Sequence, residues 1–195
     1  MFAQVISIGS ACQVSYQIRR RSPKASATHF FDWIVTDHQA LIDAVPLDFG
    51  NLLSPDAVEI GPDARYLRDC NTGLQFYAHD FAYLRGDFLS ELETVRERYL
   101  RRAERTSALL RSGDPILLVR HGFNRADVVG VAERKAIVDC FKINYPTSNL
   151  TFFFTTNLPV EEHVVESGFM AHVAECIDWK GDNASWDRAF SGISL

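Results

Sequence analysis

The chain has 195 residues, of which 47% are hydrophobic and 23% charged, and it contains 14 Phe, 3 Trp and 6 Tyr. This composition is typical of a globular protein with a sizeable core, and the length suits a single α/β domain over residues 1–195. Lys and Arg number 20 against 25 Asp and Glu, which gives a net charge of -5. A nucleic-acid-binding protein normally shows a basic footprint, so we expect no nucleic-acid partner.

Targeting and redox signals are also informative. No apolar run approaches the roughly 18 residues that a membrane-spanning helix needs, and the first residues resemble a strand rather than a signal peptide. We therefore expect a cytoplasmic protein without a membrane partner, in which the four cysteines are reduced. No two cysteines have the C-x-x-C spacing of a zinc or redox site, so the sequence predicts no metal and no cofactor. The oligomeric state stays open.

The first half of the chain contains three short predicted elements: a strand over 4–8, a helix over 12–20 and a second helix over 37–45. Thr36 or Asp37 is the expected cap of the second helix. Residues 57–78 are rich in turn formers, and alternating apolar positions near their end predict a hairpin or an edge strand.

The second half begins with the clearest predicted helix, over 87–112. Apolar positions recur there at the three-to-four spacing of a buried helix face: Leu92, Val95, Tyr99, Ala103, Thr106 and Leu110. Ser90 and Glu93 have the spacing of a capping box. Three further elements follow: a strand over 116–119, a helix over 127–141 and a strand over 150–154. This alternation predicts a mostly parallel sheet flanked by helices, a Rossmann-like three-layer arrangement. Such sheets carry their chemistry at the carboxyl ends of the strands.

Cys12 follows the first strand and a Gly-Ser break, at the place where the next helix is expected to begin. A helix N-terminus carries partial positive charge and free N–H groups, which favour a thiolate. Cys12 is therefore a candidate nucleophile, whose pKa we expect to be depressed, and the amides around Ser10, Ala11 and Gln13 are candidates to bind an oxyanion. The alternative is a small buried cysteine that packs the first helical turn.

A cysteine nucleophile needs a base and a group that orients this base. His79 ends an apolar stretch where the chain turns, which makes it a candidate base, although a structural histidine fits the same pattern. Its neighbour Asp80 need not be the group that orients it, because adjacent side chains on a strand point to opposite faces. Asp32 or Asp182 is the expected orienting carboxylate.

Three motifs stand in order along the chain: Ile-Ser-Ile-Gly-Ser-Ala-Cys at 6–12, Phe-Asp-Trp-Ile at 31–34 and His-Asp-Phe at 79–81. In these motifs the chain resembles the bacterial DUF1796 family, whose members are customarily labelled papain-like cysteine peptidases. The resemblance implies that Cys12 is the nucleophile and His79 the base. Papain-like enzymes pair a helical half with an antiparallel barrel, whereas the alternation of strands and helices here favours a parallel sheet.

Two further segments carry candidate substrate-binding residues. Asp32 and Trp33 follow the first helix, where the carboxylate is suited to orient His79 or to bind a substrate amine. In the alternative, Trp33 anchors the loop while Asp32 caps its turn. Arg120 ends a buried strand, and its guanidinium suits a carboxylate or phosphate at the carboxyl edge of the sheet. We expect Asp178 and Asp182 to converge on the same edge.

The sequence therefore predicts a cysteine-dependent hydrolase or acyl transferase with a small-molecule or peptide substrate. The alternative is a non-catalytic or sugar-modifying protein of a surface-polysaccharide pathway, in which Cys12 is structural. A more remote alternative uses His121, because Arg120-His121-Gly122 matches the signature of histidine phosphatases. That motif stands late in the chain, and Phe123 replaces the acidic residue that usually follows it.

Overall fold

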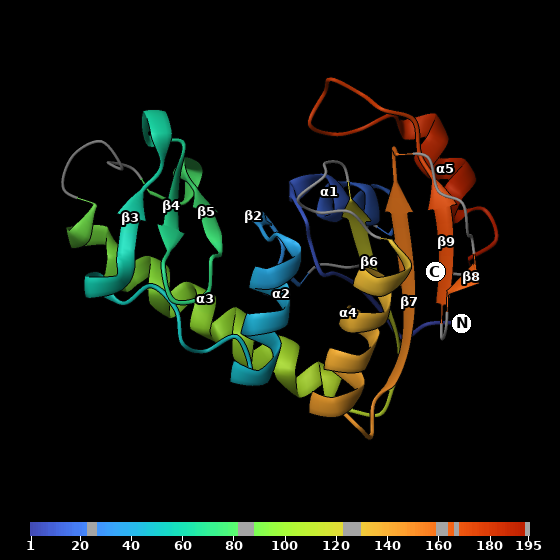
Figure 1. Ribbon diagram of the computed structural model, residues 1–195, viewed down its shortest axis with the longest axis horizontal. Helices are drawn as coiled ribbons and strands as arrows, with labels where there is room; N and C mark the ends of the chain where they lie inside the picture. The colour runs from blue at the N-terminus through green and yellow to red at the C-terminus, as the bar shows by residue number, and fades with distance from the viewer. Residues whose placement is uncertain (23–26, 82–87, 123–129, 159–163, 166–167, 194–195) are drawn as a thin grey trace.

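The computed structural model describes residues 1–22, 27–81, 88–122, 130–158, 164–165 and 168–193. In this part of the chain, the strands form two separate sheets (Figure 1). The larger sheet has the order β1-β6-β7-β9-β8, and the smaller sheet has the order β2-β5-β4-β3. The α3 helix runs behind the smaller sheet and past α2 to the lower end of α4, and so joins the two parts of the molecule (Figure 1).

The larger sheet is mostly parallel, as the alternation of elements predicts. It consists of β1 (Gln4–Ser7), β6 (Pro115–Gly122), β7 (Asn149–Thr156), β9 (Gly168–His172) and β8 (Val164–Val165). The first four strands pair in parallel, and only β8 pairs with its neighbour in the antiparallel sense. The sequence pattern did not reveal β8 and β9, because both are short and lack a continuous apolar run.

The smaller sheet is antiparallel and lies over the region where a hairpin was expected. It consists of β2 (Ile34–Val35), β5 (Gln75–Tyr77), β4 (Tyr66–Asp69) and β3 (Val58–Ile60). The predicted hairpin over 57–78 is confirmed. Strand β2, which the sequence did not predict, has two residues, too few to show the alternation of a strand. Short 3-10 helices are interspersed: η1 (Val45–Leu47), η2 (Pro55–Ala57), η3 (Pro62–Ala64) and η4 (Ala78–Asp80).

Four of the described α-helices were expected and one was not. They are α1 (Cys12–Arg21), α2 (His38–Ala44), α3 (Leu89–Leu110), α4 (Val131–Asn144) and α5 (Asn183–Phe190), of which α5 is the unexpected one. Asp37 caps α2 by accepting a hydrogen bond from the Ala40 N–H at 2.8 Å. The N-cap of α3 is Phe88, so Ser90 lies inside the helix and the predicted capping box is wrong. The expected start of α4 falls outside the described residues.

Strand alternation explains why helices cover both faces of the larger sheet. Ile116 and Leu118 of β6 pack into one core with residues of α2, α3 and α4, while Leu117 and Val119 pack into another with residues of α1 and α5. A strand buried on both faces needs apolar residues at every position, which the continuous run in β6 supplies. The Rossmann-like three-layer prediction is thus confirmed.

The turn between β1 and α1 determines where Cys12 lies. Gly9 has a φ of +90°, and a Cβ atom there would lie 2.9 Å from Nη1 of Arg120. Arg120 is fully buried and donates hydrogen bonds to the carbonyl oxygens of Ile8 (2.7 Å) and Thr36 (2.9 Å). Glycine is therefore required for both the backbone conformation and the close approach. The arginine joins the end of β1 to the segment that leads into α2, and α1 begins beside the carboxyl end of β6.

Candidate functional site

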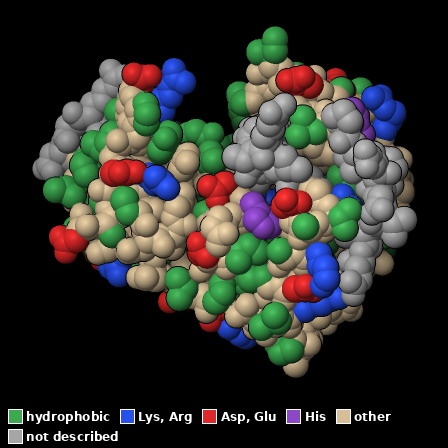
Figure 2. Space-filling view, in the orientation of Figure 1, with side chains coloured by type: hydrophobic (Ala, Val, Ile, Leu, Met, Phe, Trp, Pro, Cys, Tyr) green, Lys and Arg blue, Asp and Glu red, His purple; other side chains and the backbone are tan. Residues whose placement is uncertain are grey.

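A cavity of about 910 Å³ lies at the carboxyl ends of the parallel strands. The larger sheet contributes residues just at or beyond its strand ends: Ala11, Cys12 and Gln13 after β1, His121 in β6, Asn157 after β7 and residues 174–179 after β9. The side of the smaller sheet contributes Tyr77, His79 and Asp80, together with Arg98 and Arg102 of α3. The space-filling view is hollowed at its upper edge between the two parts of the molecule (Figure 2). The cavity thus lies where open α/β sheets usually bind their ligands, at the carboxyl ends of the strands.

Cys12 is the first residue of α1, and the extended residue Ala11 is its N-cap. The N–H groups of a first helical turn have no acceptor within the helix, so those of Cys12 and Gln13 are suited to bind an anion. Ser10 differs, because both its N–H (3.4 Å) and its hydroxyl (2.6 Å) donate to the carbonyl oxygen of His121. The predicted oxyanion set therefore loses the Ser10 amide, which is occupied within the protein.

The thiol of Cys12 is half-buried, and not open to solvent as the sequence suggested. Burial raises its pKa to about 12, and the negative charges of Asp80 and Asp32 add to the increase. Its own backbone N–H acts in the opposite direction but is the weaker effect. The expectation of a depressed pKa is wrong, because desolvation of a thiolate outweighs the favourable helix terminus.

His79 lies in η4 and carries a side chain that is 57% exposed. Its Nε2 atom is 3.9 Å from Oδ2 of Asp80, and its ring stacks on Tyr77 at 5.8 Å between centroids. The expectation that Asp80 points away from His79 assumed an extended strand. The strand ends at Tyr77, and the tight turn that follows brings the two side chains together.

Asp80 is held firmly in this position. Its carboxylate is 5% exposed and accepts hydrogen bonds from Nη1 of Arg98 (3.0 Å) and the hydroxyl of Tyr99 (2.8 Å). Both donors are neighbouring residues of α3. Asp80 thus lies beside His79, a position that the sequence analysis expected for Asp32 or Asp182.

The two carboxylates expected to orient His79 lie outside the cavity lining. Asp32 is buried behind α1, where it accepts hydrogen bonds from the Ser15 hydroxyl (2.7 Å), the His29 N–H (3.0 Å) and Arg19 (3.2 Å). Asp182 is the N-cap of α5 and accepts from the Ser185 N–H at 2.7 Å. Each carboxylate stabilises a local turn, so the structure does not support the orienting role expected of them.

Alternation along β6 separates the two residues of the phosphatase-like motif. His121 lines the cavity, whereas Arg120 does not and donates to backbone carbonyls. Of the three residues expected to converge on this edge, Asp178 lines the cavity, whereas Arg120 and Asp182 do not. Nδ1 of His121 is 3.0 Å from Oγ1 of Thr155, and burial lowers the pKa of His121 to about 4.

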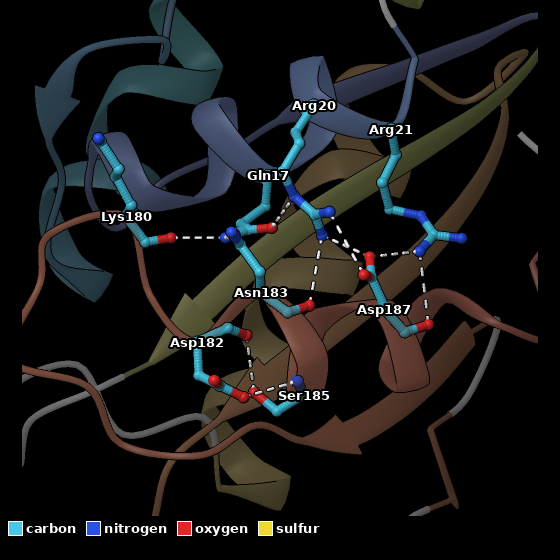
Figure 3. A network of polar contacts seen from close by, with 8 residues as sticks. All are labelled: Gln17, Arg20, Arg21, Lys180, Asp182, Asn183, Ser185 and Asp187. Carbon is cyan, nitrogen blue, oxygen red and sulfur yellow. Dashed lines mark hydrogen bonds and ion pairs between the residues drawn. The ribbon is translucent and has the colours of Figure 1, made fainter.

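The wall formed by residues 174–179 is secured by α1. Gln17 donates to the carbonyl oxygen of Lys180 (2.6 Å) and to Oδ1 of Asn183 (2.9 Å), as Figure 3 shows. Arg20 and Arg21 both form ion pairs with Asp187 of α5. The basic end of α1 therefore binds α5 and fixes the segment that precedes it.

Several lining residues had a weak signal in the sequence. Arg98 and Arg102 are spaced by four residues in the long helix and are not among the positions of its predicted buried face. Residues 174–179 include an exposed tryptophan, Trp179, but no periodicity marks them as a site. The predicted residue Trp33 does line the cavity, as do Cys12, Ala11, Gln13 and His79.

Comparisons with protein-family models, with curated proteins and with solved structures give no match. The resemblance to the DUF1796 family therefore stays a prediction. Within the described residues, no helix combines the length and apolarity that crossing a membrane requires. The same residues contain no group of three or more His, Cys, Asp or Glu side chains arranged to hold a metal ion.

Proposed function

We propose that this protein is a cysteine-dependent hydrolase or acyl transferase in which Cys12 is the nucleophile and His79 the general base. One observation carries this proposal: the cysteine at the start of α1 and the histidine of η4, far apart in the sequence, line the same cavity. The carboxylate of Asp80 beside His79 completes the nucleophile, base and orienting group that such chemistry uses.

The reaction would begin with a carbonyl group of the substrate placed beside the thiol. As Sγ of Cys12 bonds to the carbonyl carbon, His79 accepts the thiol proton, and the carbonyl oxygen gains negative charge. The N–H groups of Cys12 and Gln13 would stabilise that charge. The tetrahedral intermediate then expels its leaving group, which takes the proton from His79, and a thioester remains on Cys12. Water or an acceptor next attacks the thioester and restores the thiol.

The raised pKa of Cys12 constrains how the nucleophile is activated. A thiol with a pKa of about 12 is neutral near physiological pH, so a pre-formed thiolate does not drive the reaction. The proton would instead leave during the attack, when the substrate has displaced water and the base is in contact. We expect a small-molecule or peptide substrate and a cytoplasmic location.

Trapping the acyl-enzyme tests this proposal. The native protein is incubated with p-nitrophenyl acetate and with a peptide thioester, and intact mass and peptide mapping locate any acyl group. We expect the acyl group on Cys12, with release of p-nitrophenol accelerated over buffer. Cys12→Ala should abolish the adduct, and His79→Gln should slow its formation by roughly 100-fold or more.

Cys176 provides a matched control, because it lines the same cavity and is exposed. Cys176→Ser should leave the rate and the position of the adduct unchanged. An acyl group that appears on Cys176 as readily as on Cys12, or a rate indifferent to His79→Gln, would contradict the proposal.

The burial of Cys12 favours a second candidate, a non-catalytic or sugar-modifying protein in which this cysteine is structural. A structural thiol with a raised pKa resists alkylation both with and without an added acyl donor. Alkylation by iodoacetamide from neutral to alkaline pH distinguishes the two candidates. If Cys12→Ala loses stability while every tested acyl donor leaves the native protein unmodified, the second candidate is favoured.

A further inference from the structure

Two tryptophans from distant parts of the chain line the cavity together. Trp33 and Trp179 both line it, and their ring centroids are 6.4 Å apart at an interplanar angle of 65°. Trp33 has a φ of 69°, a backbone conformation that bulky residues rarely adopt. Such strain persists only where the surroundings enforce it, and it is concentrated at functional sites. Here it accompanies a ring placed in the cavity wall.

This aromatic pair already attracts the protein's own cations. The guanidinium carbon of Arg19 lies 5.3 Å from the Trp33 centroid, and Nζ of Lys180 lies 5.8 Å from the centroids of both Trp179 and Tyr16. The face of an aromatic ring carries partial negative charge and stabilises a cation at these distances. The rings therefore provide an electrostatic environment suited to a positively charged group.

Carboxylates stand beside the tryptophans on the same wall. Glu175 and Asp178 line the cavity, and neither forms an ion pair with another described residue. Asp80, in contrast, is paired with Arg98 on the opposite side. The wall near Trp179 thus presents two carboxylates whose charge is not balanced by an ion pair within the described chain.

From this arrangement we propose that the Trp33–Trp179 wall binds an organic ammonium group of the substrate. The proposal deepens the proposed function, on which it rests: the ammonium group would belong to the leaving group or to the acyl acceptor, while the carbonyl lies beside Cys12. Aromatic faces and carboxylates together recognise a cation, whereas a neutral apolar group of the same shape gains only from the rings.

Binding of choline and of its neutral isostere 3,3-dimethylbutan-1-ol tests this inference. Cys12→Ser protein is used with tryptophan fluorescence and calorimetry, so binding is measured without any acyl chemistry. We expect choline to bind about tenfold more tightly than the alcohol, the order expected for a partly desolvated cation on aromatic faces. Equal affinities would overturn the proposal. Binding of N-acetylglucosamine in preference to choline would also overturn it, and would identify a sugar site instead.

Variants of the wall make the test sharper. Trp179→Ala should weaken choline binding by roughly tenfold, and Glu175→Gln with Asp178→Asn should weaken it by about threefold while leaving the alcohol unaffected. Lys180→Met removes a competing cation and keeps the backbone carbonyl that Gln17 contacts, so it should strengthen choline binding by about twofold. Weaker binding in this variant would contradict the proposal.

Phe169→Ala is the matched control, because Phe169 is 49% exposed, close to the 54% of Trp179, and does not line the cavity. It should leave choline binding unchanged. Failure of the proposed function is distinguishable from failure of this inference: the first is the absence of an acyl group on Cys12, and the second is the absence of a preference for choline in Cys12→Ser protein.

Discussion

Asp32 and Asp80 are two buried carboxylates with similar local partners and different surroundings. Each is paired with an arginine and bonded to a hydroxyl group: Asp32 with Arg19 and Ser15, Asp80 with Arg98 and Tyr99. Asp32 also accepts the His29 N–H and lies outside the cavity lining. Asp80 lines the cavity, 3.9 Å from the Nε2 atom of His79.

The difference shows what separates a structural carboxylate from a candidate functional one in this protein. The bonds of Asp32 close a turn between the first helix and β2, so its charge acts within the fold. Those of Asp80 hold it rigidly while leaving it beside a half-exposed imidazole. Residue type and burial are alike at the two positions. They differ in that Asp80 lines the cavity and Asp32 does not.

The largest expected effect is the loss of stability in Asp32→Ala. This substitution leaves the Ser15 hydroxyl and the His29 N–H without an acceptor, and we expect the free energy of unfolding to fall by about 3–5 kcal/mol. Asp80→Ala should cost roughly half as much, because water in the cavity can solvate the groups that it leaves. Urea unfolding of both variants measures the difference. A greater loss of stability in Asp80→Ala than in Asp32→Ala would contradict the distinction between the two carboxylates.

The pH dependence of stability provides the next test, through His121, which is buried in β6 and lines the same cavity as His79. Burial lowers the pKa of His121 from 6.5 to about 4 in the folded protein, so the unfolded chain binds more protons between these values. Stability is therefore fully present above the unfolded pKa and falls as the pH drops toward the folded one, by about 3 kcal/mol in total.

Urea unfolding midpoints, measured from neutral pH down to the pKa of His121 in the folded protein, record this loss of stability. His121→Gln should flatten the curve, although burial also lowers the pKa of His29, which contributes in the same direction. The native sequence with His29→Gln alone should keep most of the slope. A curve that is equally steep in His121→Gln would show that His121 is not the group responsible.

Replacing the arginine partners should lower the free energy of unfolding less than replacing the carboxylates does. The side chains of Arg19 and Arg98 are 33% and 39% exposed, so each ion pair is partly screened by solvent. We expect Arg19→Met and Arg98→Met each to cost about 1 kcal/mol or less. Thermal or urea unfolding at low and high salt measures these losses of stability. A cost for Arg98→Met above that of Asp80→Ala would show that the arginine, not the carboxylate, organises this region.

The smallest expected effect is on the reactivity of Cys12. The charge of Asp80 raises the pKa of the thiol, so Asp80→Asn should lower this pKa and increase the alkylation rate about threefold at mildly alkaline pH. Iodoacetamide labelling followed by peptide mapping measures it, with Cys70 as the exposed internal control. An unchanged rate would mean that the two groups do not interact through the cavity.

The elements that the sequence predicted well have strong periodic patterns. The six inward positions expected in the long helix all belong to its buried face, and the run in β6 is buried on both sides. The missed elements are short: β2 has two residues and α5 has eight. Their stability comes from packing against other elements, as in Trp186 of α5 against the larger sheet, and not from a local signal.

The sequence by itself determined the α/β class, the mostly parallel sheet and the position of Cys12 at a helix start, because these depend on periodicity and on turn residues close together in the chain. The tertiary structure decided which carboxylate meets His79, which residues line the cavity and the direction of the Cys12 pKa. Desolvation and charge act through space, between groups that the chain separates by many residues. No local pattern encodes the burial that raises the Cys12 pKa or the turn that brings Asp80 to His79.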